Sequence, residues 1–490
     1  MLSTAAIRRP RVAPASLTSC LAPASVCRGV PSCEASAYCP SWDDPVGGPI
    51  MDVIGTRGSI RLLGIAVVCW GVVLASPAGM AMAATPFTAR VSVGTPFRQA
   101  NANSGASKLS TFGRHVTFAS AATNLVAGDS NGFTDVFVRD RENSTTKLVS
   151  MARDGKPANG NSRPGGMGVD GRLVVFGSDA SNIVTSDTNG AYDVFVRNVS
   201  TGTQSRLSVS TSGGQANGPS FRPSISAQGG IVAFDSYATN LVPGDTNGGF
   251  DVFVRNRTAN TTRRISLGSG GIQANGESTG ASVSADGRYV VYESGASNLV
   301  TDDINGQVDV FLRDLGTATT ELVSVGVGGE PANGLSTIAD VSGDGRYVVF
   351  TSVASNLVPN DTNGEADVFM RDRATGTTSR LSITSAGQQG NGQSLNGSVS
   401  DDGMRISFDS FADNLVTGDT NGQPDVFVRD RQQATTTRVS VSSSNAEGNQ
   451  GSVASAISGD GRFVSFTSGA SNLVPMDTNR AADIFVHRNP

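Results

Sequence analysis

The chain has 490 residues, of which 38% are hydrophobic, 16% charged and 6% aromatic, and it contains 59 glycines. This Gly-rich, weakly charged composition is long enough for one large domain or three ordinary ones, and it differs from that of a generic disordered chain. The formal net charge of −5 provides no basic excess to neutralise phosphates. Nucleic acid and anionic membrane surfaces are therefore poor candidates for partners.

The N-terminal part has the features of an extension followed by a secretory signal. Residues 1–50 show no periodicity, and we expect them to be an unstructured upstream extension. Residues 51–83 contain basic residues, an apolar stretch from Leu62 to Ala75 and an A-x-A site at residues 81–83, which is the pattern of a signal peptide. The apolar stretch is shorter than the roughly 20 residues that a membrane-spanning helix needs.

Cleavage before Ala84 would place the rest of the chain in the periplasm, at the cell surface or in the extracellular space. No membrane span would remain after cleavage. All five cysteines precede Ala84, so disulfides and thiolate metal sites are excluded from residues 84–490.

From residue 84 onward the sequence repeats with a period of 58 residues. One unit contains four predicted strands, at Ala281–Val283, Arg288–Glu293, Asp309–Asp314 and Thr320–Val325, and an Asp-Gly turn separates the first two. Seven such units without helical periodicity predict an all-β, seven-bladed β-propeller with four-stranded blades over residues 84–490. The repeat is marked by Gly113, Gly171, Gly229, Gly287, Gly345, Gly403 and Gly461, with no insertion or deletion between them.

The ends of the repeat region predict how the ring closes. Arg90–Val93 matches Arg438–Val441, which is a fourth strand, but no first three strands precede it. The last unit conversely stops after its third strand. We therefore expect the N-terminal strand to complete the seventh blade, which removes the exposed edges of an open array.

The repeat also carries a recognisable motif. Its clearest copy has Ser342-Gly343-Asp344-Gly345-Arg346, then Val348-Val349-Phe350, and then Asp367 to Arg373. This motif resembles the repeat of TolB-type propellers, a WD-repeat-like family of exported bacterial proteins. The resemblance implies a propeller fold. It implies no activity, because TolB itself has an additional α/β domain and usually six blades.

The loop between the second and third strands carries Asp-x-Asn-Gly-x-x-Asp in nearly every unit, with Arg480 in place of Gly in the last. Oxygen side chains at positions 1, 3 and 7 are ligands that Ca²⁺ can use, and the loop looks like a shortened integrin-type calcium loop. Asx-turns are the alternative, because Asp and Asn also bond their own backbone. The predicted metal ligands are Asp129, Asn131, Asp135, Asp187, Asn189, Asp193, Asp245, Asn247, Asp251, Asp303, Asn305, Asp309, Asp361, Asn363, Asp367, Asp419, Asn421, Asp425, Asp477, Asn479 and Asp483.

The loop after each fourth strand is also long and carries Ala-Asn-Gly in several units, for example at Asn159. It is either a polar rim for a partner or a turn copied by duplication. The two long loops of a unit are expected on the same face of the ring, where binding groups would collect.

Catalytic motifs are not recognisable. His115 and His487 lie in different units, and neither a Ser or Cys nucleophile motif nor a His pair accompanies them. We therefore expect no enzyme but a monomeric binding or scaffold module for a protein or cell-surface ligand, with calcium as cofactor. The alternatives are a carbohydrate-active hydrolase built on paired carboxylates and a structural surface protein without a ligand.

Overall fold

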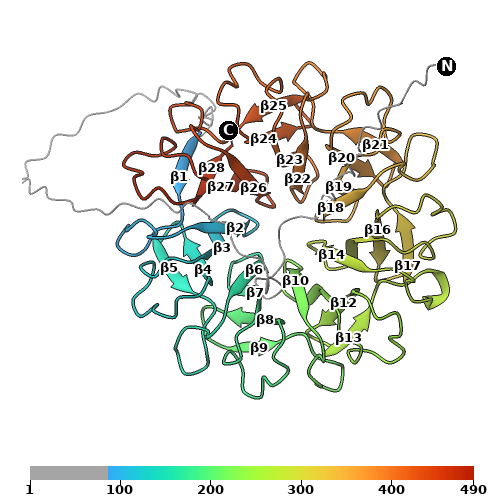
Figure 1. Ribbon diagram of the computed structural model, residues 1–490, viewed down its shortest axis with the longest axis horizontal. Helices are drawn as coiled ribbons and strands as arrows, with labels where there is room; N and C mark the ends of the chain where they lie inside the picture. Colours follow the sequence, from blue (N-terminus) through green and yellow to red (C-terminus); the bar gives the residue numbers. More distant parts are fainter. Residues whose placement is uncertain (1–85, 490) are drawn as a thin grey trace, which may run out of the picture. The chain divides into compact units, whose positions relative to one another are not determined.

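The computed structural model describes residues 86–489, which form seven four-stranded antiparallel sheets arranged as a ring (Figure 1). The predicted seven-bladed β-propeller is thus confirmed. The predicted upstream extension, residues 1–50, and signal peptide, residues 51–83, lie outside the described residues. Apart from the strands, a single 3₁₀ turn, η1 (Ser269–Gly271), is present in the part of the chain that the structure describes.

The blades follow one another along the chain. In Figure 1 the first strand of each blade lies nearest the centre of the ring and the fourth lies at the rim. Blade 1 comprises β2 (Ser104–Leu109), β3 (His115–Ser120), β4 (Asp135–Asp140) and β5 (Thr145–Leu148); blade 2, β6 (Ser162–Met167), β7 (Leu173–Ser178), β8 (Asp193–Asn198) and β9 (Gln204–Arg206); blade 3, β10 (Ser220–Ile225), β11 (Ile231–Ser236), β12 (Asp251–Asn256) and β13 (Thr261–Arg264); blade 4, β14 (Ser278–Val283), β15 (Tyr289–Ser294), β16 (Asp309–Asp314) and β17 (Thr319–Leu322); blade 5, β18 (Ser336–Val341), β19 (Tyr347–Ser352), β20 (Asp367–Asp372) and β21 (Thr377–Arg380); blade 6, β22 (Ser394–Val399), β23 (Arg405–Ser410), β24 (Asp425–Asp430) and β25 (Thr435–Arg438); and blade 7, β26 (Ser452–Ile457), β27 (Phe463–Ser468), β28 (Asp483–Arg488) and β1 (Phe87–Arg90).

The core lies between the blades. The third strands read Asp-Val-Phe-Val-Arg or a close variant and are buried on both faces, because each blade is packed between two neighbours. Within a blade, Phe350 of β19 stacks on Phe369 of β20 with ring centroids 5.9 Å apart. The same cluster includes Val291 and Val310 of the preceding blade, so each core cluster joins two sheets.

The ring closes as predicted, because β1 pairs with β28 and completes blade 7. The strand occupies Phe87–Arg90, three residues earlier than the predicted Arg90–Val93, and only Arg90 is common to both. It matches β25, which also ends at its arginine, Arg438. The Thr88 hydroxyl is 2.9 Å from Nδ1 of the buried His487, and burial lowers the pKa of that imidazole to about 4.

Every inner strand contains a β-bulge, which the sequence analysis missed. The register against the second strand shifts near the middle of the inner strand in all seven blades. A residue with positive φ stands at the bulge in six of them, and five of the six carry a Cβ. Such backbone conformations are strained for L-residues and persist only where neighbouring groups hold them. The six are Ala106, Arg222, Gly280, Ile338, Asn396 and Ala454.

Candidate functional site

The Asp-Asn-Asp triplets occupy equivalent places in the seven blades. Each lies in the loop between the second and third strands, and its second Asp is the first residue of the third strand. In blade 2, Asp193 is completely buried; its Oδ1 accepts a hydrogen bond from Ser208 Oγ at 2.5 Å, and its Oδ2 accepts one from Asn189 Nδ2 at 3.1 Å. The triplet therefore anchors the long loop to the start of a buried strand.

The asparagine of the triplet forms an Asx-turn in all seven loops. Its Oδ1 accepts the backbone N–H two residues further along, which is the alternative that the sequence analysis left open. Each Asn oxygen therefore has a backbone partner within its own loop. The donors are the N–H groups of Phe133, Ala191, Gly249, Gln307, Glu365, Gln423 and Ala481.

In five loops, called the arginine loops below, a guanidinium group lies between the two carboxylates. In blade 2, Nη1 of Arg206 is 3.1 Å from Asp187 Oδ1 and 3.1 Å from Asp193 Oδ2. Gln215 Nε2 donates to the same oxygen of Asp187 at 2.9 Å. The other four arginines and their carboxylate pairs are Arg264 with Asp245 and Asp251, Arg380 with Asp361 and Asp367, Arg438 with Asp419 and Asp425, and Arg90 with Asp477 and Asp483, all at 2.9–3.4 Å.

One arginine loop carries an additional carboxylate. Asp419, Asp425 and Glu447 of blade 6 bring three carboxylate oxygens within 4.8 Å of one another. Nη1 of Arg438 lies among them, 2.5 Å from Glu447 Oε1. The position that a cation would take in this cluster is thus already held by a positive charge.

The loops of blades 1 and 4, called the leucine loops below, have no such arginine. Leu148 and Leu322 stand where the other blades have Arg, and Pro157 and Pro331 stand where they have Gln or Glu. Within residues 86–489, no basic side chain forms an ion pair with the four carboxylates of these loops, those of Asp129, Asp135, Asp303 and Asp309.

Burial of the carboxylates in the leucine loops raises their pKa. Desolvation raises the pKa of Asp135 to about 6, although the hydrogen bonds from Ser150 and Asn131 act to lower it. Desolvation likewise raises the pKa of Asp303 to about 6. The pKa values of Asp129 and Asp309 are raised for the same reason.

The Ala-Asn-Gly loops hold neighbouring blades together. The Asn159 N–H donates to Asn182 Oδ1, and Asn159 Nδ2 donates to Ser181 Oγ. The loop that follows blade 1 is therefore bonded to the loop between the second and third strands of blade 2. The Asn131 Nδ2 group donates to Ala158 O within blade 1. Both long loops therefore lie on the same face, and these Asn side chains have structural partners.

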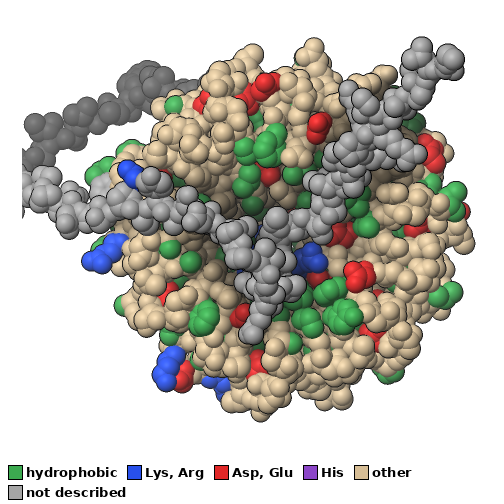
Figure 2. All heavy atoms as spheres, viewed as in Figure 1, with side chains coloured by type: hydrophobic (Ala, Val, Ile, Leu, Met, Phe, Trp, Pro, Cys, Tyr) green, Lys and Arg blue, Asp and Glu red, His purple; other side chains and the backbone are tan. Residues whose placement is uncertain are grey.

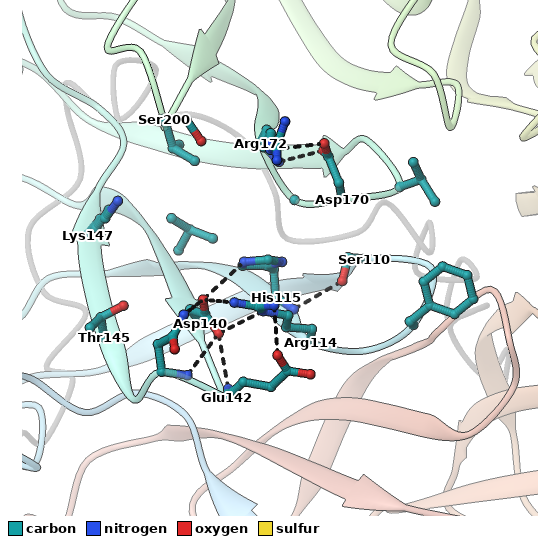
Figure 3. Close-up of a pocket in the computed structure, with 16 residues that line it drawn as sticks. Ser110, Arg114, His115, Asp140, Glu142, Thr145, Lys147, Asp170, Arg172 and Ser200 are labelled. Atoms are coloured by element: carbon teal, nitrogen blue, oxygen red, sulfur yellow. Dashed lines mark hydrogen bonds and ion pairs between the residues drawn. The ribbon is translucent and has the colours of Figure 1, made fainter.

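A cavity of about 740 Å³ opens between blades 1 and 2 (Figure 3). At three other interfaces an arginine fills this position by stacking on a ring of the neighbouring blade, Arg141 on Phe463, Arg373 on Tyr289 and Arg431 on Tyr347. Arg373, for example, lies 4.6 Å from the centroid of the Tyr289 ring and donates to Gly345 O at 2.6 Å. The equivalents in blades 1 and 2 are His115 and Val199, which are too small to fill the space. The blade 1–2 interface therefore has neither the arginine nor a Tyr or Phe ring at this position.

Charged groups of both signs line this cavity, called the blade 1–2 cleft below. Arg114 donates to both carboxylate oxygens of Asp140, at 3.1 and 2.8 Å. Burial alone would raise the pKa of Asp140, but the hydrogen bonds from Arg114 and Asn143 hold it well below its usual range. The His115 ring lies 3.5 Å from Asp140, and burial lowers its pKa, which favours the neutral imidazole at pH 7.

The blade 2 side of the cleft carries Arg172 and Asp170, 3.3 Å apart, and Figure 3 shows them opposite the His115 and Arg114 side chains. The exposed Lys147 of β5 stands at the outer end. A second cavity of about 350 Å³ shares Lys147 and Val199 with the cleft and is also lined by Leu148 and Pro157.

Two buried carboxylates of the second strands were also missed from the sequence. Asp235 accepts a hydrogen bond from Arg222 Nε at 3.2 Å, and Asp409 accepts one from Asn396 Nδ2 at 2.8 Å; the two donors are bulge residues. Desolvation raises the pKa of Asp235 to about 6 and that of Asp409 to about 7. Their contacts explain how the bulges are held.

The outer surface is weakly charged. Figure 2 shows acidic side chains distributed singly over one face of the ring, with few basic ones among them. No helix within residues 86–489 is long and apolar enough to cross a membrane.

Comparison with known proteins supports the fold and nothing finer. No protein-family model matches the chain, and no curated protein matches it. Among solved structures, an oligogalacturonate lyase in complex with manganese matches with a TM-score of 0.50 and 11% identity over 82% of this chain and 93% of the lyase. TolB from Acinetobacter baumannii matches with a TM-score of 0.35 and 13% identity over 73% of this chain and 76% of TolB. The β-propeller domain of the Trilobed protease from Pyrococcus furiosus matches with a TM-score of 0.49 and 9% identity over 79% and 94%.

The expectation that the protein is not an enzyme is corrected by these matches. It rested on the lack of a recognisable catalytic motif in a nearly uniform ring. The lyase shows that an enzyme can have this fold, so the propeller architecture gives no ground for excluding catalysis. The TolB-type resemblance implied a propeller fold, which the seven four-stranded sheets confirm, and TolB structures are among the solved structures that match.

Proposed function

We propose that the protein is a rigid binding module that acts outside the cytoplasm and takes its ligand in the blade 1–2 cleft. The observation that carries the proposal is the cavity of about 740 Å³ at this interface, where His115 and Val199 stand in the positions that an aromatic ring and an arginine fill at three other interfaces. Pockets of this size, on a preformed scaffold and lined by a few convergent polar groups, are the usual form of a ligand site. Export is supported by the signal-peptide pattern of residues 51–83.

The lining favours a polar ligand that has both hydrogen-bond donors and acceptors. Three basic groups, Arg114, Lys147 and Arg172, are balanced by three acidic ones, Asp140, Glu142 and Asp170. Phe112 at the cleft is 64% exposed and offers an aromatic surface. A segment of a partner protein with charges of both signs and an apolar side chain fits this combination, so we propose a protein ligand.

The test introduces the arginine–aromatic pair that three other interfaces have. In the double variant His115→Tyr, Val199→Arg, the new arginine can stack on the new ring and donate to Gly171 O, as Arg373 does at the Tyr289 interface. Peptides selected on the wild-type protein from a displayed random library serve as the probe. We expect their affinity to fall at least tenfold in the double variant, whose thermal stability should be retained.

Val327→Arg is the matched control, because Val327 is 69% exposed and lies in the loop between blades 4 and 5, far along the chain from the cleft. This variant adds the same charge and should leave peptide binding unchanged. Equal binding to the wild type and the double variant, or failure to select any peptide, would contradict the cleft as a protein-binding site.

A further inference from the structure

The seven loops provide an internal comparison of how one carboxylate pair is neutralised. In the five arginine loops a single guanidinium nitrogen is 2.9–3.4 Å from one oxygen of each Asp. The leucine loops keep both carboxylates and both remain buried, with Asp129 7% exposed, Asp303 5%, and Asp135 and Asp309 fully enclosed. Buried carboxylates without a counter-charge are costly, so something else must balance them.

The replacements in the leucine loops occur together. Blades 1 and 4 lack both the arginine and the Gln or Glu that accompany the carboxylates elsewhere, and they have Leu and Pro instead. Pro157 forms the same isolated bridge, with Met151, that Gln215 forms with Val209. The backbone is thus unchanged, and the difference lies in the groups around the carboxylates.

One oxygen in blade 1 marks the vacated position. Asp129 Oδ1 is buried and has no hydrogen-bond partner among residues 86–489. Its equivalents in the arginine loops, such as Asp187 Oδ1 and Asp361 Oδ1, each contact the guanidinium nitrogen. The unpartnered oxygen is therefore the equivalent of the atom that contacts a guanidinium nitrogen in the arginine loops.

Further oxygen ligands stand nearby. In the arginine loops, Nη2 donates to the backbone carbonyl that precedes the first Asp, as Arg264 does to Gly244 O at 3.2 Å and Arg438 to Gly418 O at 2.9 Å. The corresponding carbonyls in the leucine loops belong to Gly128 and Asp302. Two carboxylates and a carbonyl, completed by water, form an all-oxygen set with a charge of −2, which matches a divalent hard cation.

We propose that each leucine loop binds one Ca²⁺ between its two carboxylates, Asp129 with Asp135 in blade 1 and Asp303 with Asp309 in blade 4. The ion takes the place that a guanidinium nitrogen holds in the five arginine loops. The flexible coordination of Ca²⁺ suits a site with few fixed ligands, whereas Mg²⁺ demands near-ideal octahedral geometry. The calcium prediction from the sequence is thereby narrowed from seven loops to two.

The test converts leucine loops into arginine loops. Leu148→Arg with Pro157→Gln in blade 1, and Leu322→Arg with Pro331→Gln in blade 4, supply the Arg and Gln that four other blades have. The full chain, stripped of metal with EDTA, is titrated with Ca²⁺ by calorimetry. We expect two Ca²⁺ per wild-type chain, one in either double variant and none in the quadruple variant.

Thermal unfolding gives a second readout. The midpoint of the wild type should rise in millimolar Ca²⁺ relative to EDTA and to Mg²⁺ at matched ionic strength. The quadruple variant should unfold at the same temperature in all three solutions. Asp187→Asn, in an arginine loop, is the matched control and should still bind two Ca²⁺. Binding of no Ca²⁺ or of seven, or binding that persists in the quadruple variant, would overturn the proposal and leave protonation or water as what balances the carboxylates.

Discussion

The ion pairs of the arginine loops should be a measurable part of the stability of the ring. The perturbation is Arg206→Leu, which gives blade 2 the residue that blades 1 and 4 have at this position. The side chain of Arg206 is 10% exposed, and those of Asp187 and Asp193 are 4% and 0% exposed. Removing the guanidinium leaves two buried carboxylates unpaired, which costs about 3–5 kcal/mol for a buried pair of this kind.

The expected shift in melting temperature follows from the size of the ring. For about 400 ordered residues the unfolding entropy at the midpoint is about 0.8 kcal/mol/K, so the loss corresponds to a drop of about 4–6 °C. The assay is thermal unfolding in EDTA, followed by circular dichroism. Arg172→Leu is the control, since its ion pair with Asp170 is exposed and is worth at most about 1 kcal/mol.

The effect should also depend on pH. Burial already raises the pKa of Asp187, and it is the ionised form that becomes unfavourable when the guanidinium is removed. When the pKa of a carboxyl is higher in the folded than in the unfolded protein, the free energy of unfolding falls as the pH rises toward the folded-state pKa. The deficit of Arg206→Leu should therefore be largest above pH 7 and shrink toward pH 5. A midpoint within 1 °C of the wild type at pH 8 would refute the reasoning.

Two further predictions concern the bulges and the turns. Burial raises the pKa of Asp409 to about 7, so the stability that the protonated carboxyl contributes is lost between about pH 4 and pH 7. Asp409→Asn should match the wild type near pH 4 and exceed it by up to about 4 kcal/mol at pH 8, and parallel pH profiles in urea unfolding would contradict this. Gly345 has a φ of +75°, and a Cβ there would lie 2.0 Å from Cδ2 of Tyr289. We therefore expect Gly345→Ala to lower the free energy of unfolding by about 3 kcal/mol or more. Gly364, with a φ of +69° and open space around it, is the matched position, and Gly364→Ala should cost about 1 kcal/mol; equal melting temperatures of the two variants would show that the ring contact is not the cause.

The architecture could be predicted from the sequence because the period leaves little choice. A 58-residue repeat with four short strands and an Asp-Gly turn specifies blades, and the unmatched strand at Arg90 specifies closure. The predicted strand was displaced by three residues because it was taken to begin at Arg90, by alignment with Arg438, whereas the strand that pairs with β28 ends at Arg90. The bulges escaped notice, because a residue with positive φ such as Ile338 has no signature in a single sequence.

The candidate sites could be predicted only in part. The carboxylates of the loops were recognised, but their partner Arg206 lies in the next strand and looks like an ordinary exposed residue of an alternating pattern. The joint change to Leu148 and Pro157 is visible in the sequence, yet its meaning depends on knowing that the fourth strand and the following loop face the triplet. The cleft likewise depends on His115 and Val199 lining one cavity from two blades, which a repeat alignment does not show.

The closure by β1 and β28 sets the order in which the ring can be completed during synthesis. Six blades are made of consecutive strands and can form as the chain emerges, but blade 7 needs the first and the last strands of the ring together. The pairing of β1 with β28 joins the most distant strands of the ring and must wait until β28 has been synthesised. Until then two blade faces are open to solvent, so a chain interrupted anywhere before β28 would leave apolar surface for proteases and chaperones to recognise.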